Sequence, residues 1–401
     1  MTLDVSVVVP TCHRPELLER CLAALTAQDY PANRHEIIVV DDAASPETAW
    51  QVAHWAGRSA ATLRYLALAA PARRGPAAAR NHGWHHAQGA IIAFTDDDCI
   101  PDAGWLGAGV AAFTLPGGRD PQPALTGHGV PLAGGWGRTL VPLPTVPTDY
   151  ERDAAGLERA EAITANAFYR RDILASVGGF DERFRAAWRE DSDLHFVLLE
   201  RGARVESIPA AIVRHPVRPA RWGVSLGQQR KSRYNALLYK KHPRLYRERI
   251  QSTPPWGYYA TMATALLAFV GVGQRRRGLA FGAACCWAWL TGRFCARRLA
   301  STRRNPGHIA EMIVTSALIP PLSIYWRLRG AWEFREPFLR DRAPLWIVRL
   351  VCDDPCPSFQ IRGNRATPQQ PCHKVDLCAV IEHRAVPRRA GATSLHASAS
   401  L

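Results

Sequence analysis

Residues 90–101 read Ala-Ile-Ile-Ala-Phe-Thr-Asp-Asp-Asp-Cys-Ile-Pro, an apolar run that ends in three consecutive carboxylates. The apolar residues 91–94 are typical of a strand that is covered on both faces of a sheet. Acids at the carboxyl end of such a strand lie where open α/β sheets hold their ligands. Adjacent carboxylates repel one another, and a hard divalent cation such as Mg²⁺ or Mn²⁺ would stabilise them. The alternative is a solvated acidic turn before a helix, and the neighbouring motifs decide between the two.

Two earlier segments repeat this pattern of an apolar strand followed by polar residues. Residues 5–10 form a buried-strand run before Thr-Cys-His-Arg, and residues 36–42 form a second run that stops at two acids. Leucines at helical spacing in residues 17–25, and the segment 77–83 around Arg80, predict intervening helices. This alternation predicts βαβ units and a parallel sheet. No Gly-x-Gly-x-x-Gly follows the first strand, so the dinucleotide fingerprint is absent.

Taken in order, these motifs resemble those of the inverting family 2 glycosyltransferases of GT-A fold. The matching stretches are Val-Val-Val-Pro-Thr, Val-Val-Asp-Asp, Ala-Arg-Asn-x-Gly and Phe-Thr-Asp-Asp-Asp, followed much later by Glu-Asp-Ser-Asp-Leu. The resemblance implies an α/β fold: a GT-A, Rossmann-like mixed sheet that binds a nucleotide sugar, with a helical, membrane-associated segment after it. It also implies a nucleoside diphosphate sugar as donor and Mg²⁺ or Mn²⁺ as cofactor.

The resemblance assigns roles on the donor side. Asp98 would coordinate the metal on the donor diphosphate, and Asp96 would be a metal ligand that lies towards the sugar and ribose. Asp42, with Asp41 as the alternate, would contact the base or ribose, and Arg80 would face the nucleotide and its phosphates. The remaining donor-binding residues that the resemblance implies are Pro10, Thr11, Arg14 and Asp97.

On the acceptor side, Asp191 matches the general base of the family, which takes the proton from the acceptor hydroxyl. Acids at a helix start also suit the helix dipole, so simple capping is the alternative role for this segment. Asn166 and Glu190 are expected on the acceptor side, although a strand Asn can equally bond locally. His215, just after the last predicted strand, is either a further metal ligand or a structural histidine.

The middle of the chain carries weaker signals. Gly and Pro are dense in residues 115–147, and Gly-Gly-Trp-Gly at 134–137 predicts a mobile loop rather than core. The stretch to residue 160 is either a surface linker or an acceptor-binding loop. Residues 205–209 and 211–216 predict two closing strands. Gln-Gln-Arg-Lys at 228–231 lacks the Trp of processive synthases, which argues against processive synthesis.

Charge divides the 401 residues into two parts. Residues 1–213 carry 19 Lys and Arg against 26 Asp and Glu, whereas residues 214–350 carry 25 against 5. Apolar runs at 255–273, 279–292 and 309–326 predict helices that span a membrane or lie in its interface. Buried soluble helices are a third alternative, which the flanking arginines disfavour. Without the aromatic-basic pattern of an RNA module, we expect no nucleic-acid partner.

Four segments follow from these observations. Residues 1–218 are the expected catalytic domain, 219–253 a basic helical connector, 254–340 the membrane-associated helices, and 341–401 a disordered tail. In that tail, Cys352, Cys356, Cys372, Cys378 and His373 fit no paired zinc-binding spacing. No signal peptide precedes the first strand, and the scattered cysteines predict reduced thiols in the cytoplasm.

The sequence therefore predicts an enzyme that transfers a sugar from a nucleoside diphosphate sugar to a hydroxyl acceptor, with inversion and metal dependence. The expected acceptor is lipid-linked or a cell-envelope glycan, and the expected location is the cytoplasmic face of a bacterial cell membrane. The alternative is a non-catalytic nucleotide-sugar-binding or regulatory module at the membrane.

Overall fold

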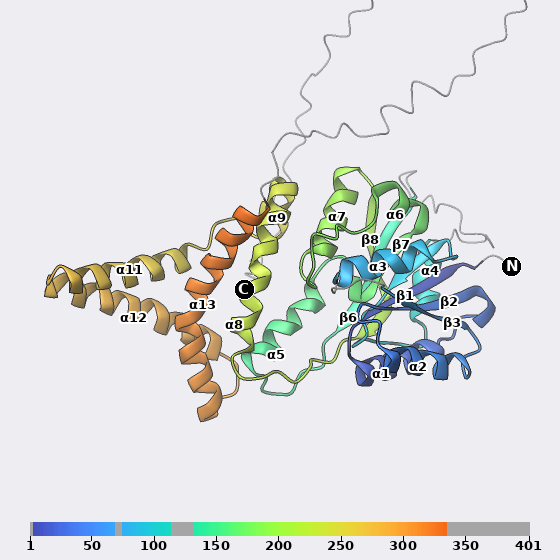
Figure 1. Cartoon of the computed structure of the whole chain (residues 1–401), viewed down its shortest axis with the longest axis horizontal. Helices are drawn as coiled ribbons and strands as arrows, with labels where there is room; N and C mark the ends of the chain where they lie inside the picture. Colours follow the sequence, from blue (N-terminus) through green and yellow to red (C-terminus); the bar gives the residue numbers. More distant parts are fainter. Residues whose placement is uncertain (1–2, 69–73, 114–130, 335–401) are drawn as a thin grey trace, which may run out of the picture. The chain divides into compact units, whose positions relative to one another are not determined.

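The computed structural model describes residues 3–68, 74–113 and 131–334, and an eight-stranded mixed sheet forms the centre of the catalytic part (Figure 1). The strand order is β3-β2-β1-β4-β7-β6-β8-β5. The strands are β1 (Val5–Thr11), β2 (His35–Asp41), β3 (Thr62–Ala67), β4 (Ile91–Phe94), β5 (Ile100–Pro101), β6 (Leu132–Leu140), β7 (Ala167–Arg170) and β8 (Arg204–Arg214). β1 to β4 are parallel, β7 is antiparallel to both β4 and β6, and β8 is parallel to β6 and antiparallel to β5. The predicted mixed α/β sheet is confirmed.

The first strands are apolar throughout because both faces of the sheet are covered. Side chains alternate along a strand, so Val7 and Val9 of β1 pack in one core cluster while Val8 packs in the other. α1 (Pro15–Thr26) contributes to the first cluster, and α3 (Pro76–His85) contributes to the second. α2 (Pro46–Ala56), which the sequence analysis did not predict, packs against β3.

The segment Gly-Gly-Trp-Gly at 134–137 lies in β6, so its prediction as a mobile loop was wrong. A Cβ at Gly134 would be 2.4 Å from the Tyr169 ring, and one at Gly137 would be 2.1 Å from the carbonyl oxygen of Ala211. These glycines allow neighbouring strands to pack closely, which is a use of glycine that composition does not distinguish from a flexible loop. Residues 114–130 of the same predicted loop lie outside the described residues.

The two closing strands predicted at 205–209 and 211–216 are one strand, β8. Gly137 pairs with Ile208 and Arg138 pairs with Ile212, so three residues of β8 are accommodated between consecutive residues of β6. An irregularity of this kind bends the strand without ending it. The proline at position 209 therefore marks a bulge and not a turn.

The remaining helices of the described chain extend from α4 to α13, which ends at Glu333. Those of the catalytic part and connector are α4 (Trp105–Ala111), α5 (Asp149–Ala154), α6 (Arg171–Val177), α7 (Glu190–Glu200), α8 (Val224–Gln228), α9 (Arg233–Lys241) and α10 (Pro243–Arg249), with short 3-10 turns η1 (Ala32–Arg34), η2 (Ala155–Arg159), η3 (Thr164–Asn166) and η4 (Gln229–Ser232). The last three are α11 (Trp256–Gly273), α12 (Arg277–Leu299) and α13 (Pro306–Glu333).

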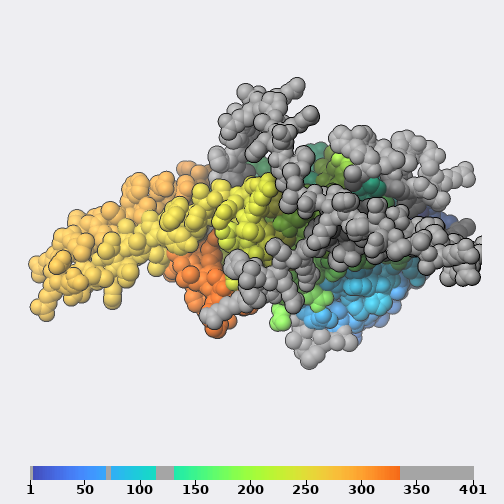
Figure 2. Space-filling view, turned by 90° about the horizontal axis from the view of Figure 1, so that it is seen from above, coloured from blue at the N-terminus to red at the C-terminus, as the bar shows by residue number. Residues whose placement is uncertain are grey.

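In the part of the chain that the structure describes, α11, α12 and α13 are the helices long and apolar enough to cross a membrane. Only 11% of the most apolar window of α11 and of α12 is buried inside the protein, against 33% for α13. Figure 2 shows α11 and α12, in yellow to light orange, packed side by side with their surface open. The short run predicted at 279–292 extends to a 23-residue helix, and α13 continues through Glu311 and two internal prolines.

These helices are joined to the catalytic part by polar contacts as well as by apolar packing. The Arg298 side chain of α12 donates to Asp149 Oδ2 at 2.8 Å and to Thr315 Oγ1 of α13 at 2.7 Å, and all three residues are buried. A Cβ at Gly330 of α13 would be 2.3 Å from the Arg233 carbonyl oxygen, so α13 lies directly against α9. Because breaking a buried ion pair leaves an uncompensated charge, the Arg298–Asp149 contact couples the two parts of the chain.

Two glycines of α4 test how tightly this helix packs on the sheet. A Cβ at Gly109 would be 2.1 Å from the Phe168 ring, whereas a Cβ at Gly107 would meet no atom within 4 Å. We expect Gly109→Ala to lower the free energy of unfolding by about 1–3 kcal/mol through overpacking. Gly107→Ala should raise it by up to about 1 kcal/mol, because alanine favours helix. Thermal unfolding of the detergent-solubilised protein measures both, and equal effects at the two positions would contradict the packing.

Candidate active site

The polar residues singled out in the sequence gather at one edge of the sheet. Since β1, β2, β4 and β8 all run in the same direction, their carboxyl ends meet there. Thr11 ends β1, Asp41 ends β2, the three acids follow β4, and His215 follows β8. This is the edge at which α/β sheets hold ligands, as the sequence predicted.

Arg80 of α3 links the acids of β4 to the start of α7. Its side chain, 1% exposed, donates to Asp96 Oδ1 at 2.7 Å and to Glu190 Oε1 at 2.9 Å. Burial opposes the charge of the guanidinium, but the charges of Asp96 and Glu190 outweigh it and raise the pKa of Arg80. The same pairing outweighs burial at Asp96 and lowers its pKa. Arg80, predicted to face the donor phosphates, thus bridges two carboxylates.

The first turn of α7 carries Glu190 and Asp191. It begins after Arg189, whose φ of 77° lies in the left-handed region that costs energy for a non-glycine residue. Burial, and then the charge of Asp191, raise the pKa of Glu190 to about 7. Asp191 is half-buried, and its Oδ1 accepts from the Ser192 backbone N–H at 2.6 Å. Among the described residues, no donor bonds its other carboxylate oxygen, which is therefore available to a substrate.

Asp97 faces the loop after β1. Its carboxylate accepts from Thr11 Oγ1 at 2.8 Å and from the Arg14 guanidinium at 3.0 Å, and the residue is 1% exposed. Burial raises the pKa of Asp97 to about 6 despite the Arg14 charge. Pro10 is buried in β1, where it is in register with Val40. These contacts fix the loop that was predicted to border the nucleotide.

Asp41, the last residue of β2, and Asp42, which follows it, have different surroundings. Asp41 is fully buried, and its carboxylate accepts from the backbone N–H groups of Ala43 and Ser45 at 2.9 and 2.7 Å, so it shapes the turn. Asp42 is half-buried, and its two oxygens accept from the backbone N–H groups of Arg74 and Gly75, immediately before α3. The preference for Asp42 as the donor contact stays a prediction.

Asp98 lies in a group that suits a divalent cation. Within the described residues, ligand atoms of Asp98, Cys99 and His215 all lie within 4.8 Å of one another. The Nε2 of His215 is 3.4 Å from Asp98 Oδ1, while burial raises the pKa of the Cys99 thiol well above its usual value. A cysteine sulfur is a soft ligand, whereas the carboxylate of Asp98 is the hard oxygen ligand that Mg²⁺ and Mn²⁺ prefer, and His215 offers an imidazole nitrogen beside it. Asp96, the other predicted metal ligand, pairs with Arg80 through Oδ1, and its role at the metal stays a prediction.

Arg218, which the sequence analysis missed, occupies the other side of Asp98. Its Nε is 3.0 Å from Asp98 Oδ2, and its side chain is 40% exposed. A cation at Asp98 and the Arg218 guanidinium therefore compete for one carboxylate. The only sequence signal was position: Arg218 follows three residues after His215.

Asn166, expected on the acceptor side, lies in the core with 0% exposure. Its amide donates to the carbonyl oxygens of Arg138 and Ala211 at 3.1 and 3.0 Å, and accepts from Trp105 Nε1 at 2.8 Å. The local bonding that the sequence left open is the arrangement observed, and we leave Asn166 out of the acceptor site. Tyr169 was also missed: its hydroxyl is buried with no hydrogen bond among the described residues, and burial and the Asp191 charge raise its pKa.

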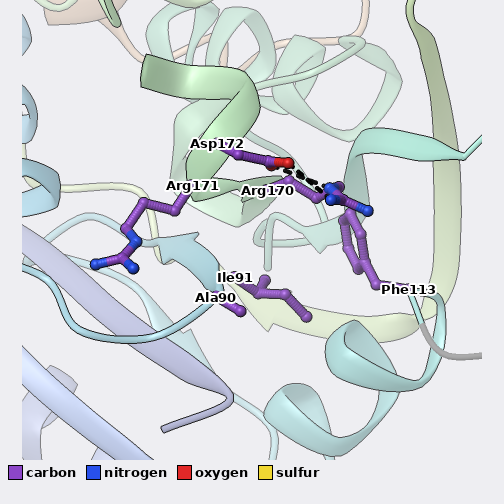
Figure 3. A pocket seen from close by; sticks show the side chains of 6 residues that line it. All are labelled: Ala90, Ile91, Phe113, Arg170, Arg171 and Asp172. Atoms are coloured by element: carbon purple, nitrogen blue, oxygen red, sulfur yellow. Dashed lines mark hydrogen bonds and ion pairs between the residues drawn. The ribbon is translucent and has the colours of Figure 1, made fainter. Parts of the chain in front are cut away.

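A cavity of about 240 Å³ lies at the opposite end of β4 (Figure 3). Ala90 and Ile91, at the start of the strand, line it, whereas the acids follow the end of the strand. Arg170 inside it is already paired with Asp172 at 2.7 Å. This cavity is therefore separate from the candidate active site.

The ion pairs of Arg80 with Asp96 and Glu190 make a stability prediction. Arg80→Met leaves the buried Glu190 and the half-buried Asp96 without their cation, and we expect a loss of about 3–5 kcal/mol at pH 7. The loss should shrink at pH 5, because without Arg80 the folded-state pKa of Glu190 rises further and the acid is protonated there. Chemical denaturation at both pH values measures this. Arg201→Met, an exposed control, should change stability by less than about 0.5 kcal/mol; a loss at Arg80 that does not depend on pH would contradict the charge explanation.

Comparisons with known proteins bear on the family of this chain. The sequence profile described as "Glycosyl transferase family 2" matches residues 6–178, and the profile "Glycosyl transferase family group 2" matches residues 153–326. The chain is 29% identical over 224 residues to the glycosyltransferase AglE of Haloferax volcanii, which covers 54% of this chain and 67% of that protein. It is 31% identical over 229 residues to the pre-mycofactocin glycosyltransferase of Mycobacterium tuberculosis, covering 53% and 42%.

Among solved structures, the mannosyltransferase from Pyrobaculum calidifontis in complex with GDP-Man and Mn²⁺ is similar with a TM-score of 0.47 and 20% identity, over 84% of this chain and 89% of that one. The two profile matches together cover both the donor-side acids and the apolar helices. The chain belongs to family 2 of the glycosyltransferases, with the GT-A fold, and is a glycosyltransferase enzyme.

Proposed function

We propose that the enzyme transfers a sugar from a nucleoside diphosphate sugar to a hydroxyl group of a lipid-linked or cell-envelope glycan acceptor, with inversion and with a divalent cation. The observation that carries this proposal is the buried Arg80, whose single guanidinium bonds Asp96 after β4 and Glu190 at the start of α7. It brings the donor-side acids next to the turn that carries Asp191, although Arg80 and Glu190 are 110 positions apart.

Asp191 is the proposed general base. Its oxygen without a hydrogen bond takes the proton of the acceptor hydroxyl, and the acceptor oxygen attacks the anomeric carbon as the bond to the diphosphate breaks. Attack from the face opposite the leaving group inverts the configuration. Glu190, with a pKa of about 7, is partly protonated at neutral pH, so the two adjacent acids do not both carry a full charge.

Asp98 and His215 are the proposed metal ligands, and the cation would supply positive charge against the diphosphate as negative charge develops there. The Arg14 side chain, 41% exposed, is held by Asp97 at the same edge and would add a second positive charge. Asp42, a half-buried acid that follows β2 and contacts the segment just before α3, is the proposed contact to the ribose or base.

We further propose that α11, α12 and α13 hold the enzyme at the cytoplasmic face of a bacterial membrane. Support comes from their length, their apolar composition and the small buried share of α11 and α12. Lipid would cover the apolar side chains that the protein leaves exposed, such as Leu266, Phe269 and Phe281.

Substitution of the base separates binding from chemistry. We expect Asp191→Asn to bind the donor as wild type does but to lose transfer by about 10²–10⁴-fold, because the proton has no acceptor. A screen of UDP-, GDP- and dTDP-sugars with Mn²⁺, read as donor hydrolysis, first identifies the donor to use. Glu200→Gln, which changes an acid at the other end of α7, is the control and should retain transfer. Wild-type transfer by Asp191→Asn would overturn the assignment of the base.

The competition at Asp98 gives an independent test of the metal site. In the absence of nucleotide, Asp98→Asn should abolish measurable Mn²⁺ binding, whereas Arg218→Gln should tighten it by up to about fivefold, since a partly exposed ion pair is worth about 0.2–1 kcal/mol. Arg214→Gln is the matched control, because Arg214 pairs with Asp102 instead. Calorimetric titration with Mn²⁺ measures all three. Unchanged binding in Asp98→Asn would show that the metal lies elsewhere.

A further inference from the structure

A second cavity, of about 250 Å³, lies between the catalytic part and the start of α13. Its walls come from α5, the segment that follows β8, α8, the end of α12 and the first turns of α13. Figure 1 shows α5, α8 and α13 converging in this region. None of the donor-side acids Asp42, Asp96 and Asp98 is among the residues that line it, so it is distinct from the proposed donor site.

The arginines that line this cavity differ in whether an acid of its walls pairs with them. Arg298 is neutralised by Asp149, and Arg303 donates to the Val146 carbonyl oxygen and lies 3.9 Å from Glu151. Arg221 is exposed and, among the described residues, has no acidic partner. Arg218 also lines the cavity, and its acid, Asp98, belongs to the metal site. Arg221 is therefore available to an anion, and Arg218 becomes available to one when it releases Asp98.

His308 of α13 provides an independent sign of a missing ligand. The residue is 6% exposed, and its Nε2 is buried without a hydrogen-bond partner among the described residues. Its Nδ1 lies 3.6 Å from Glu311 Oε2, while Glu311 Oε1 accepts from the Gly223 N–H at 2.7 Å. A buried polar atom without a partner destabilises the fold, and an acceptor oxygen in the cavity would remove that cost.

We propose that this cavity binds a phosphate monoester, with Arg221 and Arg218 facing its charge and His308 Nε2 donating to one of its oxygens. Arginine forks and an imidazole N–H are suitable donors for phosphate oxygens. The phosphate could be supplied by a lipid headgroup or by a soluble compound. His308 lies in the first turn of α13, a helix that is apolar enough to cross a membrane. This position favours a lipid headgroup as the source of the phosphate.

The cavity and the metal site share Arg218, so their ligands are linked. A phosphate that draws the Arg218 guanidinium into the cavity frees Asp98 Oδ2, and a cation at Asp98 in turn frees Arg218 for the phosphate. Coupling of this kind is reciprocal. This consequence, and the contribution of Arg218, rest on the proposed metal site, whereas phosphate binding by Arg221 and His308 does not.

Calorimetric titration of the full-length protein in a nonionic detergent tests the proposal, with three probes: dihexanoyl phosphatidic acid, dihexanoyl phosphatidylcholine and inorganic phosphate. We expect phosphatidic acid to bind, and binding to weaken at least fivefold in Arg221→Gln and in His308→Gln. Arg230→Gln, which removes an exposed arginine outside the cavity, should bind as wild type does. Arg221 is exposed, so its replacement leaves the fold intact even if the His308 variant proves unstable.

The three probes also distinguish the source of the phosphate. Phosphatidic acid that binds more tightly than inorganic phosphate supports a lipid headgroup, and equal binding of both supports a soluble phosphate in the same cavity. The proposal is overturned if phosphatidylcholine binds as tightly as phosphatidic acid, or if neither Arg221→Gln nor His308→Gln weakens binding. Because the readout needs no donor and no transfer, it stands or falls separately from the proposed function.

Discussion

The buried guanidinium of Arg80 is the interaction on which the arrangement of the active site depends. The fold removes this positive charge from water almost completely. The charge is stable there because two carboxylates pair with it, Asp96 after β4 and Glu190 at the start of α7. One cation between two acids leaves a residual negative charge, and the raised pKa of Glu190 shows how the protein reduces it. The two ion pairs of Arg80 thus link the donor edge of the sheet to the turn with Asp191, in addition to the apolar packing of Leu194 and Leu198 of α7.

Much of the fold follows from signals that are local in the sequence. A buried strand needs an unbroken apolar run, and a ligand-binding edge needs polar residues where the run stops. β1, β2 and β4, with the polar residues at their carboxyl ends, could therefore be predicted from a few residues each. The first turn of α7 was recognised in the same way, since Glu190 and Asp191 lie directly before an apolar helical pattern. The comparisons support the family that these motifs resemble.

What could not be predicted are properties that depend on distant neighbours. Glycines 134, 135 and 137 have the composition of a loop, and only the nearness of Tyr169, Ile208 and Ala211 explains them as strand residues. Asn166 has an amide that could hydrogen-bond a sugar, but three residues from other elements already hydrogen-bond that amide in the core. Arg218 is one arginine in a basic region, and its pairing with Asp98 depends on the path of the chain after β8.

The contact between Arg298 and Asp149 also has a consequence for how the protein is made. The two residues are 149 positions apart, so α5 leaves the ribosome well before the helix that supplies its buried cation. Until α12 and α13 are in place, the catalytic part has an acid at its surface that the finished protein buries. The burial of Asp149 is therefore completed only when Arg298 of α12 reaches it, so a helix near the end of the described chain finishes the packing of an element made long before it.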